Sequence, residues 1–160
     1  MFSQTAEYAL RAVVALADGG GKPLTTQRIA QTTKVPANYL AKVLQSLSRA
    51  GIVSSQRGLG GGSMLARPAA EISVYEVIEA VDPIHRIRTC PLDIASHGTD
   101  LCPLHRRLDN AAAQVENEFR ATSIEDLVTE PTNSPPLCGL APAGSAAGLA
   151  IQTRGRRSTG

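Results

Sequence analysis

The stretch from residue 25 to residue 68 most constrains what this chain can fold into, because two short helical segments there precede a glycine-rich hairpin. Thr25 can cap the first helix, since its hydroxyl accepts hydrogen bonds from free backbone N–H groups of the first turn. Pro36 suits the start of the second helix, where its fixed φ fits and its missing N–H is not needed. Gly51 ends that helix, as glycine does where the backbone must turn left-handed. Residues 32–35 are predicted to form the turn between the two helices.

The second helix, predicted from residue 37 to residue 50, is amphipathic. Its apolar residues share one face at helical spacing, and they are Leu40, Val43, Leu44 and Leu47. The opposite face presents Asn38, Lys42, Gln45 and Arg49. Short strands are predicted at 52–55 and 64–66, with Arg57 and several glycines in the loop between them. This order predicts a winged helix-turn-helix, whose second helix enters the major groove of DNA.

Double-stranded DNA is therefore the predicted partner of this region. The residues expected to contact it are Thr26, Asn38, Tyr39, Lys42, Gln45, Arg57, Gly58 and Gly60. Side chains of the second helix would face the major groove, and Arg57 would enter the narrow minor groove. The glycines would let the backbone of the hairpin approach the sugar–phosphate chain. The alternative interpretation is a small globular helical domain with a surface loop.

Charge is divided unevenly along the chain, although the net charge is only +2. Residues 1–68 carry eight Lys or Arg and two Asp or Glu, which makes +6. Residues 69–130 carry five basic and twelve acidic residues, which makes −7, and residues 131–160 carry three basic residues and no acidic ones. A basic first half favours contact with phosphates in that half alone, and a chance asymmetry is the alternative.

Three motifs occur in order along the chain: Ser3–Ala12 (SQTAEYALRA), Asn38–Leu40 (NYL) and Arg57–Gly62 (RGLGGG). Together they resemble the Rrf2 family of bacterial repressors, which includes iron–sulfur cluster regulators and nitric-oxide sensors. The resemblance covers about residues 1–128. It implies a transcriptional regulator built on a winged helix-turn-helix.

The fold predicted from these patterns is mainly α with a small β wing. An apolar stripe predicts a helix over residues 3–17, and Ser73 can cap a further helix over 74–81. The predicted organisation has four parts: a DNA-binding domain (1–82), a cysteine-containing sensor loop (83–102), a dimerisation helix with a short C-terminal helix (103–130), and a disordered tail (131–160). The tail is rich in Pro, Gly and small residues.

The longest helix is predicted from Pro103 to about Arg120. Its apolar residues approach a heptad seam, and they are Leu104, Leu108, Ala111, Ala112, Val115 and Phe119. A long apolar-striped helix beside one recognition helix per chain predicts a homodimer that represses transcription from a pseudo-palindromic operator. Packing of this helix on its own chain is the alternative. Ser123 and Asp126 form a capping box that predicts a short helix to about residue 128.

A long segment, 84–101, lies between two Cys-Pro pairs and ends at the long helix, so it is predicted to be functional. Cys90 and Cys102 enclose eleven residues, and His105 follows Cys102 by three positions. Thiolates and imidazoles at such a junction can bind a soft or borderline metal or an iron–sulfur cluster. The absence of a secretion signal argues against a disulfide scaffold. Simple thiols, some of them redox-active, are the alternative.

The family resemblance sharpens this prediction. Family members that bind a cluster carry three cysteines in this loop, and here Ser96 stands where the middle cysteine is expected. The resemblance therefore implies Cys90, Cys102 and His105 as ligands, with Glu7 of the same or the second subunit as the fourth. A two-iron, two-sulfur (2Fe–2S) cluster is favoured, since histidine replaces cysteine readily in two-iron centres. Other candidate ligands are His85, His97 and Cys138.

An enzyme is not expected, because the run of glycines lacks the strand-to-helix context and the lysine of a phosphate-binding loop. The chain has no apolar run long enough to span a membrane and no basic-then-apolar signal, so a cytoplasmic location is expected. The competing function is a cluster-free regulator of the same family, controlled by thiol oxidation, a small ligand or a protein partner.

Overall fold

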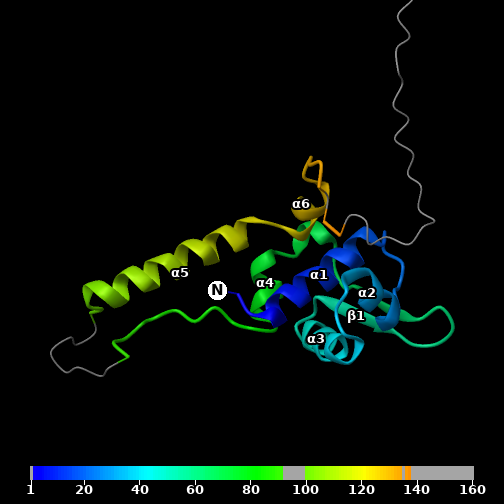
Figure 1. The fold of residues 1–160 in the computed structure, drawn as a ribbon, viewed down its shortest axis with the longest axis horizontal. Coiled ribbons are helices and arrows are strands. Elements are labelled where there is room, and N and C mark those ends of the chain that lie inside the picture. The colour runs from blue at the N-terminus through cyan, green and yellow to red at the C-terminus, as the bar shows by residue number, and fades with distance from the viewer. Residues whose placement is uncertain (1, 92–99, 135, 138–160) are drawn as a thin grey trace, which may run out of the picture.

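The computed structural model describes residues 2–91, 100–134 and 136–137, and its elements are labelled in Figure 1. They are α1 (Gln4–Asp18), α2 (Thr26–Thr33), α3 (Ala37–Arg49), β1 (Val53–Gln56), β2 (Gly62–Leu65), η1 (Ala69–Glu71), α4 (Val74–Glu79), α5 (Pro103–Ala121) and α6 (Ile124–Thr129). The predicted class, mainly α with a small β wing, is confirmed. The described residues contain no helix both long and apolar enough to cross a membrane.

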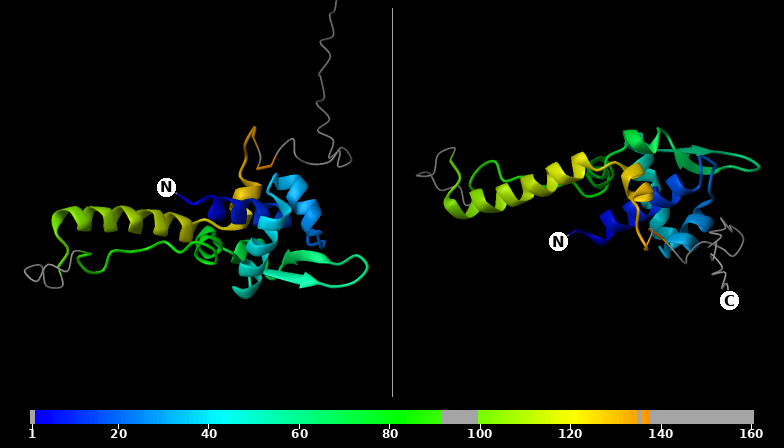
Figure 2. Two further views of the ribbon diagram at one scale, coloured as in Figure 1. Left: turned by 60° about the horizontal axis from the view of Figure 1, so that its bottom comes forward. Right: turned by 90° about the horizontal axis from the view of Figure 1, so that it is seen from above.

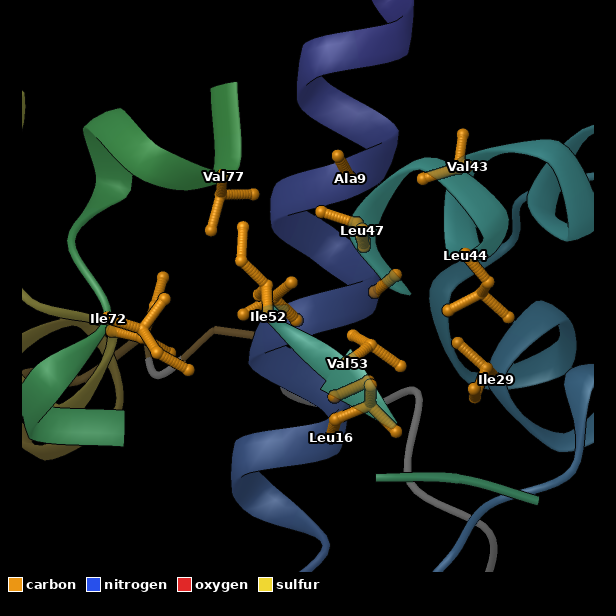
Figure 3. Packing of buried hydrophobic residues seen from close by; sticks show 14 of the residues in the cluster. Ala9, Leu16, Ile29, Val43, Leu44, Leu47, Ile52, Val53, Ile72 and Val77 are labelled. Carbon is orange, nitrogen blue, oxygen red and sulfur yellow. The ribbon is translucent and has the colours of Figure 1, made fainter. Parts of the chain in front are cut away.

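Helix α1 is the centre of the core. Ser3 caps it, since its side-chain oxygen accepts a hydrogen bond from the backbone N–H of Ala6 at 3.1 Å. Small alanines on its buried face allow neighbouring elements to approach closely, and Figure 3 shows branched side chains of α2, α3, β1 and the α4 region gathered around it. The largest fully buried side chains include Leu16, Ile29, Leu47, Ile52 and Ile72. The core is therefore aliphatic, as a chain with 3% aromatic residues requires.

The helix-turn-helix forms as predicted, with a shorter turn. The hydroxyl of Thr25 accepts a hydrogen bond from the N–H of Arg28 at 3.2 Å, which caps α2. Helix α2 runs on to Thr33, because that side chain is fully buried and its hydroxyl donates to the Ile29 carbonyl at 2.7 Å. Lys34 then reverses the chain with a left-handed φ of 55°. The turn is consequently narrower than the predicted range 32–35.

The wing is a two-stranded antiparallel hairpin. Val53 pairs with Leu65 and Gln56 with Gly62. The strands lie one to two residues from their predicted positions, because Leu24 exchanges two backbone hydrogen bonds of 2.8 Å with Ser63 and extends the pairing there. A Cβ on Gly62 would lie 2.5 Å from the Leu24 carbonyl oxygen, so this close approach requires glycine. The wing is thereby tied to the segment that leads into α2.

Helices α4 and α6 close the other side of α1. Both predicted caps are present, since Ser73 with Glu76 and Ser123 with Asp126 form capping boxes. Helix α4 is shorter than predicted and ends at Glu79. The backbone N–H of Ile124 donates to the Ile72 carbonyl at 2.8 Å, and Ile124 is fully buried in the core. The sequence grouped α6 with the long helix, whereas the structure packs it against α1 and η1.

Helix α5 projects away from this body. The segment after α4 runs outward beside it, and α5 then returns to the body (Figures 1 and 2). None of its 19 residues, all of which the structure describes, is buried. At the base of α5, the ring of Phe119 contacts the ring of Phe2 with centroids 5.2 Å apart. Leu137, which falls in the predicted disordered tail, packs against the core, while residues 138–160 lie outside the described part of the chain.

Candidate DNA interface and cysteine site

The outward face of α3 is polar, as the periodicity predicts. Leu40, Val43, Leu44 and Leu47 are buried in the core, which fixes the rotation of the helix. Asn38, Lys42 and Gln45 are exposed on the other side. A helix held in this way presents side chains at a spacing that suits base edges and phosphates in a major groove.

A groove of about 460 Å³ runs between α2, α3 and the wing. Two predicted contact residues, Thr26 and Gln45, line it together. The remaining lining residues are Ala41, Leu44, Ser48, Arg49, Ser55 and Ser63. Ser48, Arg49 and Ser55 were not predicted as site residues. Ser48 and Arg49 could have been found from their helical phase with Gln45, whereas Ser55 reaches the groove only through the strand register.

The tip of the wing exposes Arg57 next to glycines. Gly58 and Gly60 have left-handed φ values of 101° and 78°, and the Gly58 carbonyl accepts from the N–H of Gly61 at 2.9 Å. This tight turn leaves Leu59 fully exposed at its apex. The wing therefore offers one cation and uncovered backbone on a narrow edge, which suits a minor groove or a phosphate chain.

Tyr39 differs from the other predicted contact residues. Its hydroxyl shares a hydrogen bond of 2.5 Å with Thr5 Oγ1, and its ring meets the edge of the Tyr8 ring at a centroid distance of 5.5 Å. The side chain remains 36% exposed. Tyr39 thus connects the first turn of α3 to α1 while still reaching the surface.

Glu7 is paired within its own helix. Its carboxylate lies 2.5 Å from Nη2 of Arg11, while Nη1 of Arg11 donates to the Thr33 carbonyl at 3.1 Å. The same guanidinium lies 5.8 Å from the centroid of the Tyr8 ring. Arg11 therefore joins Glu7 to the end of α2, at the turn of the helix-turn-helix.

Cys102 and His105 come together at the start of α5. Cys102 is the N-cap, with Pro103 in the first turn, and its Sγ lies 3.3 Å from Nδ1 of His105. Both side chains are half-buried. A thiolate and an imidazole nitrogen at this separation can bind one iron or zinc atom.

Cys90 is half-buried and is not in a disulfide. Within the described residues, no three His, Cys, Asp or Glu side chains form a group that could hold a metal ion. Cys90 and Glu7 are therefore not assembled with Cys102 and His105 in one chain. Ser96, His97 and Cys138 lie outside the described residues.

The cysteine site stands far from the DNA-binding body of its own chain. Phe119, at the base of α5, contacts Phe2, whereas Cys102 lies at the opposite end of that helix. Seventeen residues of helix separate Cys102 from Phe119, which corresponds to about 25 Å. Figure 1 shows the start of α5 at the end of that helix that points away from α1. Glu7, one turn into α1, therefore cannot reach Cys102 of the same chain.

Comparisons with known proteins agree with this architecture. Residues 2–130 match the family model of Rrf2, described as iron-dependent transcriptional regulators. A protein of Aquifex aeolicus named as an HTH-type transcriptional regulator is 30% identical over 131 residues, which cover 80% of this chain and 91% of that protein.

Two solved structures show the same fold. CymR (YrzC) of B. subtilis, described as its global cysteine regulator, is 27% identical with a TM-score of 0.69, and the match covers 82% of this chain and 98% of CymR. IscR of T. potens is 23% identical with a TM-score of 0.66, over 79% of this chain and 85% of that one. Both support a mainly helical fold with a two-stranded wing.

Proposed function

The chain belongs to the Rrf2 family of DNA-binding transcriptional regulators, and from this premise we propose that it is a homodimeric repressor controlled by an iron–sulfur cluster. The observation that carries the proposal is the Cys102–His105 pair, 3.3 Å apart at the far end of a projecting helix. The operator would be pseudo-palindromic, since two identical recognition helices related by a two-fold axis read two related half-sites.

Contact with DNA would be made by α3, the groove beside it and the wing. The exposed side chains of Asn38, Lys42 and Gln45, with Thr26 in the groove, supply donors and acceptors for the major groove. Arg57, with the backbone of Gly58 and Gly60, would meet the minor groove. The net charge of +6 on residues 1–68 supports contact with phosphates in this half of the chain.

The surface of α5 supports the homodimer. Leu104 and Leu108 are 63% and 52% exposed. Ala111, Ala112 and Val115 continue the same face and line an open apolar cavity of about 450 Å³ beside Phe2 and Ile78. A long helix whose apolar seam is uncovered in one chain is the pattern of a helix that pairs with its copy.

The cluster would be held by Cys90, Cys102, His105 and the partner subunit's Glu7. The two ligands already together suit cluster iron, since thiolate and imidazole both coordinate it in two-iron centres. Because α5 holds Cys102 far from Glu7 of the same chain, the proposal takes the fourth ligand from the second subunit. When bound, a 2Fe–2S cluster supplies one-electron redox chemistry and reactivity toward nitric oxide.

A cluster ligand on α1 would connect the cysteine site to the DNA-binding surface. Glu7 now pairs with Arg11, which also bonds the Thr33 carbonyl and lies over Tyr8. If Glu7 turns away to bind iron, Arg11 loses its carboxylate partner at the turn between α2 and α3. The orientation of the recognition helix would then depend on whether the cluster is present.

The competing function is regulation by thiol oxidation without a metal. Two observations favour it: Cys90 and Cys102 are both partly exposed thiols, and the similar CymR of B. subtilis is described as a global cysteine regulator. In that case Cys102, whose Sγ lies 3.3 Å from Nδ1 of His105, would be the first thiol to examine for oxidation.

The test is anaerobic reconstitution followed by iron and sulfide analysis and an absorption spectrum. We expect cluster binding in the wild type and its loss in Cys90→Ala, Cys102→Ala and His105→Ala. Glu118→Ala, at an exposed position of α5, is the matched control. Full occupancy in Cys102→Ala would contradict the ligand set. Absence of iron from the wild type would favour the thiol mechanism.

The crossed ligand can be tested by complementation. Glu7→Ala and Cys102→Ala homodimers each lack one ligand at both sites. A mixed dimer of the two would regain one complete site if Glu7 acts across the dimer. No recovery in the mixed dimer would contradict the crossed arrangement.

A further inference from the structure

One ion-pair cluster fastens the segment before the cysteine loop to α5. Nε and Nη2 of Arg86 donate to the two carboxylate oxygens of Asp109 at 2.7 and 2.8 Å, and Nη1 donates to Glu116 at 3.2 Å. The backbone N–H of Ile87 also donates to Asp109, at 2.9 Å. Asp109 therefore holds both the side chain and the backbone of this segment. We call the contacts of Arg86, Ile87, Asp109 and Glu116 the strap.

The strap is shielded from solvent, unlike an ordinary surface ion pair. The side chains of Arg86, Asp109 and Glu116 are 21%, 13% and 16% exposed. Hydrogen bonds from Arg86 hold the pKa of the Asp109 carboxyl below its usual range, against the opposing effect of desolvation. Bidentate guanidinium–carboxylate pairing is the strong, directional form of an ion pair. It can therefore fix the position of the backbone to which it is attached.

The strap sets a register between the extended segment and the helix. Along α5, Asp109 lies seven residues from Cys102, which at 1.5 Å per residue is about 10 Å. Along the segment, Cys90 lies three residues beyond Ile87, and because the chain bends at Thr89 these residues span at most about 10 Å. Figures 1 and 2 show this segment running beside α5 toward the start of that helix. The strap therefore limits Cys90 to within about 10 Å of its anchor, on the side of the start of α5.

We propose that Arg86 and Asp109 are positioning residues that hold Cys90 close to α5 and so set the spacing between the thiols of Cys90 and Cys102. The use of that spacing in sensing rests on the proposed function, whereas the position of Cys90 does not. Breaking the strap would let Cys90 move along and away from α5, since only three residues separate it from the anchor.

The strap is also continuous with the joint between α5 and the DNA-binding body. Glu116 accepts hydrogen bonds from both Arg86 and Arg120. The guanidinium of Arg120 lies 3.5 Å from the centroid of the Tyr75 ring on α4. A change in the position of Cys90 would thus alter the contact between Arg120 and Tyr75, through which α5 packs on the DNA-binding body.

The test measures thiol spacing without any metal. In the full-length, reduced and metal-free chain carrying Cys138→Ser, dibromobimane joins Cys90 and Cys102 only when both thiols reach one reagent molecule. Each thiolate displaces one bromide, so two C–S bonds form and two bromide ions leave. Reaction of each cysteine with monobromobimane measures its intrinsic reactivity and normalises the rate. Mass spectrometry separates cross-links within one chain from those between chains.

We expect Asp109→Asn and Arg86→Ala each to slow intrachain cross-linking about tenfold, the effect of losing one charge-assisted hydrogen-bond pair. Glu118→Gln, which neutralises an exposed carboxylate on the same helix, should leave the rate unchanged. The charge-exchanged double variant, Arg86→Asp with Asp109→Arg, should recover part of the rate, because it restores the pair between positions 86 and 109 but not the bonds of Glu116 and Ile87. That recovery also excludes general loss of folding as the cause.

An unchanged rate in Asp109→Asn would overturn the proposal, as would equal slowing in Glu118→Gln. Anaerobic reconstitution of the same variants separates the two proposals. If cross-linking depends on the strap but the wild type takes up no iron, the cluster proposal fails and the positioning role stands. If the wild type binds a cluster whose absorption and circular dichroism are unaltered in Asp109→Asn, the cluster proposal stands and the strap has no role in its site.

Discussion

The hydroxyl of Tyr39 lies within hydrogen-bond distance, 2.5 Å, of Thr5 Oγ1, so the exposed start of α3 is joined to the first turn of α1. Two residues further along α1 is Glu7, the proposed ligand, and four beyond that is Arg11, bonded to the end of α2. Thr5 and Arg11 of α1 thus contact the two sides of the turn between α2 and α3. These contacts are the basis for proposing that ligand binding by Glu7 alters the position of the recognition helix.

Tyr39→Phe removes that hydrogen bond and keeps the ring against Tyr8. We expect the free energy of unfolding to fall by about 0.5–1.5 kcal/mol, the usual net contribution of one hydrogen bond. Urea denaturation of the variant measures it. Tyr8→Phe, which leaves the Tyr39–Thr5 bond in place, is the matched control, and a larger loss there than in Tyr39→Phe would contradict this account.

Gln45→Ala should relax base preference, because Gln45 lines the groove beside α3 and can read a base edge. The discrimination lost at one position should be about 1–3 kcal/mol. Lys42→Ala should instead weaken binding to all sequences alike, through loss of a phosphate contact. The measurement is binding of DNA selected from a random pool and of single-base variants of it. An unaltered base preference in Gln45→Ala would show that Gln45 does not contact a base.

Arg57→Ala tests the wing. Loss of its charge should lower affinity for the selected DNA about tenfold. It should also reduce by about one the number of counterions released on binding, as measured by the slope of log affinity against log salt concentration. Arg107→Ala, which removes a charge from the exposed surface of α5, is the control. If the two variants bind DNA equally well at moderate salt, the wing does not contact DNA.

Most of the DNA-binding fold could be predicted because its signals are local. The cap at Thr25, the apolar phase of Leu40 to Leu47 and the glycines of the wing each determine structure within a few residues. The cap at Ser73 and the capping box at Ser123 were also predicted from the sequence. The match of residues 2–130 to the family confirms the predicted family.

What could not be predicted depends on contacts between distant residues. The Arg86–Asp109 pair spans 23 residues and has no periodic signature, so the sequence showed only an irregular loop. The packing of α6 on α1 depends on Ile124 entering a core built by five other elements. The pairing of Cys102 with His105 could be predicted from helical spacing. The distance of Glu7 from that pair could not, because it depends on the direction in which α5 projects from the body.

Acid should release the strap. The pKa of Asp109 is held below its ordinary value of 3.8, chiefly by hydrogen bonding from Arg86, and the pKa of Glu116 is lowered by Arg120 and Arg86. A carboxyl whose pKa is lowered on folding stabilises the folded state above its unfolded pKa, and that contribution is lost as pH falls through the folded pKa. The strap should therefore persist at about pH 5 and open only well below it.

A carbon-13 NMR titration of the side-chain carboxyls, assigned by comparison with Asp109→Asn, checks this prediction. The midpoint for Asp109 should lie below 3.8 and should rise in Arg86→Ala. A midpoint at or above 3.8 in the wild type would contradict the ion pair.

Control of DNA binding by the cysteine site is tested by the dissociation constant for selected DNA, measured anaerobically on one preparation before and after removal of the cluster. Coupling between two sites of one protein is commonly about 1–3 kcal/mol, so we predict a difference of about tenfold or more. The difference should vanish in Cys102→Ala. Equal dissociation constants with and without the cluster would contradict the claim that this site controls DNA binding.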